Sequence, residues 1–206
     1  SNKDKATVVA TFDMPEQQSE LQVTYEAMAD GRIHVDMHFT PGNKALPEMP
    51  RLGMRMILKA DYDQMTWLGR GPQENYADRK SGYLIGKYSA SVREQYHPYV
   101  RAQETANKCD VRWFTLASKA NKGLKVVGDE PLSVSAWNCP QADLLYAPSV
   151  QEHRHGGCVD KKPMVWVNID HRQMGVGGDN TWGAMVHPEY TITPHEWSYG
   201  FTIMKK

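Results

Sequence analysis

The chain has 206 residues with 24 basic and 24 acidic side chains, so its formal net charge is zero. That balance argues against a nucleic-acid face and against a basic membrane-surface helix, since both need an excess of Lys and Arg. No apolar run approaches the roughly 18 residues of a transmembrane helix, so we expect no membrane-spanning segment. No linker, repeat or low-complexity tract divides the chain, and we predict one domain over residues 1–206.

The predicted elements, taken in chain order, are almost all strands. After a first strand at 7–12, the clearest pair lies within 21–39, where apolar and polar residues alternate on both sides of Asp30-Gly31. An Asp-Gly pair between two alternating runs predicts a hairpin turn. Further strands are predicted at 52–58, 65–68, 84–89, 111–117, 124–127, 132–136, 164–169 and 199–204.

The last predicted strand places Tyr199, Phe201 and Ile203 on its inward face. Helical features are confined to 140–146, where Pro140 would occupy the first helical position. About ten short strands with almost no helix predict an all-β, antiparallel sandwich.

Four long irregular segments interrupt the strands, at 69–82, 96–110, 148–163 and 175–188. Loops of this length are uncommon in compact domains and are usually functional or disordered, so we expect function on them. The last segment sets four glycines around Trp182, which should leave the indole prominent. The chain has 6 Trp and 10 Tyr against 4 Phe. Such aromatics either face polar partners such as sugars or fill the core.

Histidine pairs raise the question of a metal site. His34 and His38 share one strand face with Asp36, a set that suits zinc or iron. Because the opposite face carries the apolar residues, we favour a solvated polar face. His153 and His155 form a similar pair on a loop, without a third ligand at a telling spacing.

The chain's thiols and carboxylates add no chemistry by themselves. Without a CxxC motif, unpaired thiols are expected at Cys109, Cys139 and Cys158.

Glycosidase chemistry needs two carboxylates about 5–10 Å apart. The carboxylates eligible by type are Glu74, Asp78, Glu104, Asp179, Glu189 and Glu196. Spacing alone pairs none of them, and for each the alternative is a salt bridge or a turn cap.

Four blocks of sequence carry a resemblance to a known family. They are WLGRGPQENYADR (67–79), QYHPYVRAQETANKCDVRW (95–113), VNIDHRQMGVGGDNTWG (167–183) and PEYTI (188–192). In this order they resemble the C-terminal small-chain domain, the fifth domain, of LacZ-type β-galactosidases of glycoside hydrolase family 2. The resemblance implies a galactose mutarotase-like supersandwich and retaining hydrolysis of terminal β-D-galactosides. The family domain is longer at its N-terminus, so the implied domain is truncated there. The strand that begins at Thr7 would follow several early strands of the family domain that are missing here.

The resemblance also implies roles for particular residues. The catalytic glutamates of the family belong to a TIM barrel outside this chain, so no residue here takes a catalytic role. Trp182 matches the tryptophan that stacks on the sugar in the aglycone position. The mobile loop at the active-site mouth matches Gly71, Pro72, Gln73, Glu74, Asn75 and Tyr76, with Gly71 as the hinge.

The implied partners are those of the parent enzyme. They are a lactose-like galactoside, the barrel and other domains of the parent chain, and further copies in a homo-oligomer. Mg²⁺ and Na⁺ bind mainly through other domains in the family, so no cofactor is expected in this segment. The sequence does not determine the compartment, although a bacterial enzyme of the cytoplasm or periplasm is expected.

Two alternatives remain open at this point. The ending ITPHEWSYGFTI (192–203) resembles that of the stand-alone aldose 1-epimerases, with Glu196 as a catalytic residue and His187, His195 or His97 as its partner. We favour a vestigial origin for that ending. The other alternative is a β-sandwich that only binds carbohydrate or only buttresses the barrel and the oligomer. A Trp182 lying flat in a core would support the purely structural form.

Overall fold

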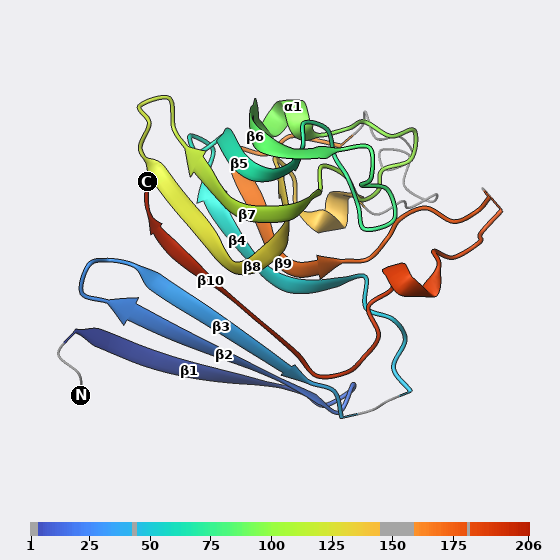
Figure 1. Ribbon diagram of the computed structural model, residues 1–206, viewed down its shortest axis with the longest axis horizontal. Helices are drawn as coiled ribbons and strands as arrows, with labels where there is room; N and C mark the ends of the chain where they lie inside the picture. The colour runs from blue at the N-terminus through green and yellow to red at the C-terminus, as the bar shows by residue number, and fades with distance from the viewer. Residues whose placement is uncertain (1–3, 43–44, 145–158, 181) are drawn as a thin grey trace.

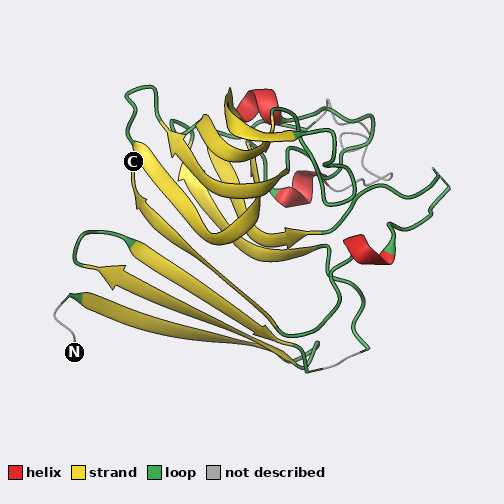
Figure 2. Ribbon diagram, in the orientation of Figure 1, coloured by secondary structure: helices red, strands yellow, loops and turns green. Residues whose placement is uncertain are grey.

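The computed structural model describes residues 4–42, 45–144, 159–180 and 182–206, and antiparallel strands dominate it (Figure 2). Its strands are β1 (Lys5–Met14), β2 (Ser19–Met28), β3 (Ile33–Thr40), β4 (Arg51–Lys59), β5 (Gln64–Gly71), β6 (Leu84–Ser91), β7 (Lys108–Ala117), β8 (Gly123–Trp137), β9 (Met164–Gln173) and β10 (Trp197–Lys205). Each predicted strand lies within one of these elements, and the all-β, antiparallel prediction is confirmed.

The long strand β8 divides the sheet into two layers. The main path runs β1-β2-β3-β10-β8-β7-β5-β6, while β9 pairs with both β8 and β4. Residues 124–128 of β8 pair with β10, and residues 133–137 pair with β9 instead. Figure 1 shows the result, with β1, β2, β3 and β10 below the layer that contains β4–β9.

The sequence predicted two strands, 124–127 and 132–136, where the structure has the single strand β8. The chain stays extended between them but changes its partner. Gly128 lies at this change, and an added Cβ there would meet the Glu130 carbonyl oxygen at 2.3 Å. Close packing of the backbone therefore requires glycine at this position. The alternation of apolar and polar residues is interrupted here, although the strand continues.

The core lies between the two layers. Val35, Met37 and Phe39 of β3 pack in one cluster with Trp67 of β5 and Phe114 of β7. Tyr199 and Phe201 of β10 are buried in the same cluster, as their alternation predicted. Gly31 in the β2–β3 turn has a φ of +85°, which is the conformation that glycine favours.

The described residues also contain three short helices: α1 (Val92–Gln95), η1 (Gln141–Leu144) and η4 (Pro188–Tyr190). Helix α1 was not predicted, although Ser91 and Glu94 form a capping box at its start. The helix expected at 140–146 is the short 3₁₀ turn η1, and residues 145 and 146 lie outside the described residues. None of the described helices has the length or apolar character that crossing a membrane requires.

The cysteine prediction is confirmed at two positions. Cys109 and Cys139 are free and buried, and burial raises the pKa of each thiol to about 11. Both thiols are therefore protonated and unreactive at neutral pH. Cys158 lies outside the described residues.

Candidate functional site

Glu74 anchors the segment that follows β5. Its carboxylate accepts hydrogen bonds from the Ala106 backbone N–H at 2.7 Å and the Thr105 hydroxyl at 3.0 Å. Arg79 donates to it at 2.5 Å, and the Tyr99 hydroxyl donates to the same oxygen. Burial acts to raise the pKa of Glu74, but these hydrogen bonds together hold it below its ordinary value. Glu74 is therefore ionised at neutral pH, and it accepts four hydrogen bonds in this structure.

Asn75 ties the same segment to the start of β7. Its side chain is fully buried, and its Oδ1 accepts from the Cys109 backbone N–H at 2.8 Å. The Asn75 backbone N–H donates to the Asn107 carbonyl at 2.8 Å, while the Asn107 amide donates to the Asn75 carbonyl at 2.9 Å. The Asn75 amide also donates to the Gln73 carbonyl at 3.0 Å. Gln73 is exposed beside this buried anchor.

Gly71, the expected hinge, is the last residue of β5 and is buried. Its φ does not lie in the left-handed region. A Cβ at this position would meet the Tyr88 ring at 2.7 Å, so close packing requires the glycine. Hinge motion at Gly71 stays a prediction.

Trp182 lies on the loop between β9 and η4 and is 93% exposed. Its backbone N–H donates to Asn180 Oδ1 at 2.8 Å, and Gly183 follows with a φ of +105°. The indole is therefore presented to solvent from a shaped turn and does not pack into the core of this chain. A large exposed aromatic face of this kind is typical of a binding surface.

Asp78 connects the segment that follows β5 to the loop that carries Trp182. Its Oδ2 accepts from the backbone N–H groups of Val176 at 3.0 Å and Gly177 at 2.6 Å. Gly175 packs so closely that an added Cβ would meet Asp78 Cγ at 2.7 Å. One carboxylate thus connects the segment of Glu74 to the segment of Trp182. In the sequence Asp78 is only one of six carboxylates of a type that suits glycosidase chemistry. The glycines at 175 and 177 are the one local feature that indicates the close backbone approach to Asp78.

A buried charged cluster lies behind these loops, formed by Arg51, Tyr76, Glu104 and Asp170. Arg51 donates to Glu104 Oε2 at 2.8 Å and also to Asp170 Oδ2. The Tyr76 hydroxyl donates to Glu104 at 3.3 Å. Burial, with Glu104 nearby, raises the pKa of Asp170 to about 8 even though Arg51 opposes the shift. Two carboxyl groups therefore share one guanidinium, and one of them keeps its proton at neutral pH.

The residues named for the epimerase alternative have other contacts in this structure. Glu196 is exposed in the turn before β10. His195 stacks on Trp197 with ring centroids 3.8 Å apart, and His187 pairs with Asp179 at 2.9 Å. His97 contacts the Tyr99 ring. Within the described ranges, no hydrogen bond joins any of these histidines to Glu196.

The histidines of β3 make cross-strand contacts with β10. His38 Nδ1 lies 2.7 Å from Ser198 Oγ, and His34 Nδ1 lies 3.2 Å from Thr202 Oγ1. Asp36, between them, is exposed on the same face. Among the residues that the structure describes, no three His, Cys, Asp or Glu side chains are grouped as a metal site would require. His153 and His155 lie outside the described residues.

Comparisons with known proteins find β-galactosidases. A β-galactosidase from Priestia megaterium is 37% identical over 171 residues, which is 82% of this chain and 16% of that protein. A β-galactosidase from Lactobacillus delbrueckii subsp. bulgaricus is 33% identical over 192 residues, covering 92% and 18%. The chain thus spans about a sixth of the curated relatives it matches.

Similar solved structures include a galactose 1-epimerase from Lactobacillus acidophilus. That match has a TM-score of 0.46 and 11% identity, and it covers 100% of this chain and 64% of the epimerase. The model of the family described as "Beta galactosidase small chain" matches residues 1–203. Because that match covers nearly the whole sequence, the chain belongs to the β-galactosidase small chain family.

Proposed function

We propose that the chain is the C-terminal domain of a LacZ-type β-galactosidase of glycoside hydrolase family 2, a retaining enzyme that hydrolyses terminal β-D-galactosides. The observation that carries the proposal is an exposed Trp182 on a loop anchored through Asp78, within a chain of this family. The acid/base and nucleophile glutamates belong to a TIM barrel elsewhere in the parent chain. In this proposal Mg²⁺ and Na⁺ bind the parent enzyme through its other domains.

In this proposal Trp182 is the platform for the sugar in the aglycone position. An indole covers the C–H face of a pyranose with a large apolar area and few rotatable bonds. The loop with Gly71, Gln73, Glu74 and Asn75 borders the bound disaccharide and shifts when it binds. The substrate is a lactose-like galactoside, and the parent enzyme is a homo-oligomer.

We expect the isolated chain not to hydrolyse nitrophenyl β-galactoside, because the paired catalytic glutamates lie outside it. The full-length enzyme should hydrolyse the same substrate with retention, seen by NMR as initial release of β-galactose. The isolated chain should be prepared from a host without β-galactosidase, and a thermal melt should show that it is folded. Turnover that a point substitution within this chain abolishes, or inversion by the full-length enzyme, would contradict the proposal.

Asp78→Ala in the full-length enzyme should raise the KM for lactose severalfold, with less effect on an aryl galactoside. The substitution removes the acceptor for two backbone N–H groups, so the Trp182 loop loses its anchor. Asp78→Asn is the matched control, since its amide keeps an acceptor oxygen and should stay close to wild type. Equal losses in both variants would show that the carboxylate charge matters, and would contradict an anchoring role.

A further inference from the structure

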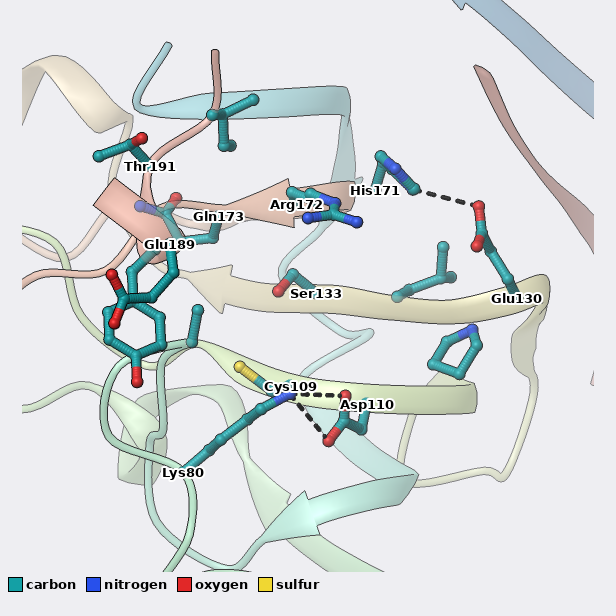
Figure 3. Close-up of a pocket in the computed structure, with 15 residues that line it drawn as sticks. Lys80, Cys109, Asp110, Glu130, Ser133, His171, Arg172, Gln173, Glu189 and Thr191 are labelled. Atoms are coloured by element: carbon teal, nitrogen blue, oxygen red, sulfur yellow. Dashed lines mark hydrogen bonds and ion pairs between the residues drawn. The ribbon is translucent and has the colours of Figure 1, made fainter. Parts of the chain in front are cut away.

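A cavity of about 260 Å³ lies apart from the residues assigned above (Figure 3). Strands β7, β8 and β9 supply three of its walls, through Cys109 and Asp110, residues 130–133, and residues 171–173. Lys80 and residues 189–192 close the remaining side. Neither Trp182 nor the segment from Gln73 to Asn75 lines it.

Two buried polar atoms at this cavity have no hydrogen-bond partner within the described residues. Gln173 is 7% exposed, and its Oε1 accepts no hydrogen bond from them. His171 Nδ1 lies 3.2 Å from Glu130 Oε1, as Figure 3 shows, but without the alignment of a hydrogen bond. Buried side-chain polar atoms are normally satisfied, so these two atoms leave hydrogen-bonding capacity that no described residue fills.

The backbone turns side chains toward this cavity. In the pairing of β4 with β9, Leu52 opposes Arg172 and Gly53 opposes Asp170, so His171 is the extra residue of a bulge. Bulges re-aim side chains and are common beside binding sites. Asp110, on the opposite wall, has a φ of +56°, which is costly for a residue other than glycine.

The polar groups of the cavity suit a neutral ligand rich in hydroxyl groups. The donors are Lys80, which also pairs with Asp110, and Arg172, whose guanidinium lies over the Trp197 ring. The acceptors are the acidic residues Asp110, Glu130 and Glu189, of which Glu130 also lies beside His171. Three carboxylates would repel a phosphate, and the two cations would repel a metal ion. Burial lowers the pKa of His171, so its neutral ring offers one donor and one acceptor.

The volume of the cavity and its apolar lining residues further restrict the kind of ligand that it can bind. Pockets for drug-sized ligands hold about 300–1,000 Å³, so a cavity of about 260 Å³ suits one sugar ring. Pro131, Leu132 and Tyr190 supply apolar surface for the C–H groups of such a ring. We propose that this cavity binds a single neutral pyranose, with Arg172, Gln173 and Glu189 hydrogen-bonding its hydroxyl groups, at a site separate from Trp182.

The test is a titration of the folded chain with D-galactose and with D-glucose, followed by saturation-transfer NMR. It is run in a Trp182→Ala background, so that the exposed indole contributes no signal. We expect saturable, millimolar binding that Arg172→Ala weakens about tenfold, because a hydrogen bond from a charged donor contributes roughly that factor. Arg172 is exposed, so its removal should leave the fold intact, and a thermal melt checks this. Arg32→Ala, an exposed arginine far along the chain from the cavity residues, is the matched control and should change nothing.

Gln173→Leu provides a second variant, because it removes the unpartnered oxygen while keeping the side-chain bulk. It too should weaken sugar binding without lowering the melting temperature. The full-length enzyme should bind the same sugars at this site, and Arg172→Ala should leave its aryl galactoside hydrolysis unchanged. That last measurement separates this inference from the proposed function, which is tested by galactoside hydrolysis and its stereochemistry.

Several results would overturn the inference. No saturable binding of either hexose would mean that the cavity holds water alone. Equal affinity in the Arg172→Ala and Arg32→Ala variants would place the sugar elsewhere. Binding of inorganic phosphate in place of the sugars would show that the site selects anions. Binding by the isolated chain but not by the full-length enzyme would mean that another part of the parent protein covers the cavity.

Discussion

Trp182→Ala in the full-length enzyme is expected to raise the KM for lactose about tenfold. Aromatic stacking contributes on the order of 0.5–1.5 kcal/mol beyond area burial, and a tenfold change corresponds to about 1.4 kcal/mol. Inhibition by galactose should change less, because galactose alone does not occupy the aglycone position. The KM of Trp182→Phe for lactose should lie between those of the wild type and Trp182→Ala, since phenylalanine keeps a smaller aromatic ring. Steady-state kinetics with lactose and an aryl galactoside measure the difference, and transfer of galactose to glucose should fall together with lactose affinity.

The scaffold alternative predicts a different pattern for the same variant. If Trp182 only supported the fold, lactose and aryl galactoside hydrolysis would fall in parallel and the melting temperature would drop. The side chain is 93% exposed in this chain. Surface substitutions of this kind change the free energy of unfolding by about 0.5 kcal/mol or less, so we expect the melting temperature to stay unchanged.

Arg51→Ala should destabilise the chain by about 3–5 kcal/mol, the range measured when one partner of a buried ion pair is removed. At neutral pH the cluster is close to neutral, because Arg51 balances one carboxylate while the other carboxyl keeps its proton. Without Arg51 the remaining charge on Glu104 or Asp170 is buried and unpaired. For a chain of this size the melting temperature should fall by roughly 6–20 °C.

Arg32→Ala is the control for Arg51→Ala, since Arg32 pairs with Asp30 at an exposed turn. It should change the free energy of unfolding by about 0.5 kcal/mol or less. Combining Arg51→Leu with Glu104→Gln and Asp170→Asn should restore much of the stability, because no unpaired charge then remains buried. Similar losses in Arg51→Ala and Arg32→Ala would show that the cluster does not stabilise the fold.

The same cluster predicts a pH dependence with a definite sign. Asp170 has a folded-state pKa of about 8, against about 3.9 in an unfolded chain. The folded state therefore holds an extra proton between these values, and its free energy of unfolding decreases as the pH rises from about 4 to about 8. Above that range the contribution no longer changes. Denaturant unfolding at several pH values should show this decrease in the wild type, and Asp170→Asn should lack it.

Local patterns in the sequence determined the strands and the turn chemistry. Alternation along 33–39 specifies one buried and one solvated face whatever strand lies beside it, so β3 could be predicted without its neighbours. The Asp30-Gly31 pair fixes a turn because few other residues adopt the required φ. The glycines around Trp182 predicted a prominent indole, and it is exposed. Helix α1 has a readable capping box, but four residues are too few to show a helical period.

Only the tertiary structure decided which distant residues meet. β8 pairs with β10 along one half and with β9 along the other, and no local pattern distinguishes those partners. Arg51 meets Asp170 across 119 residues of sequence, and Asp78 meets Gly177 across 99. From the sequence alone, a charged residue is predicted to be exposed, because burying a charge costs free energy unless an oppositely charged or hydrogen-bonding partner is present. Whether that partner is present depends on strands that approach each other only in the folded chain, so the charged cluster, the Asp78 anchor and the cavity at His171 were set by the tertiary structure alone.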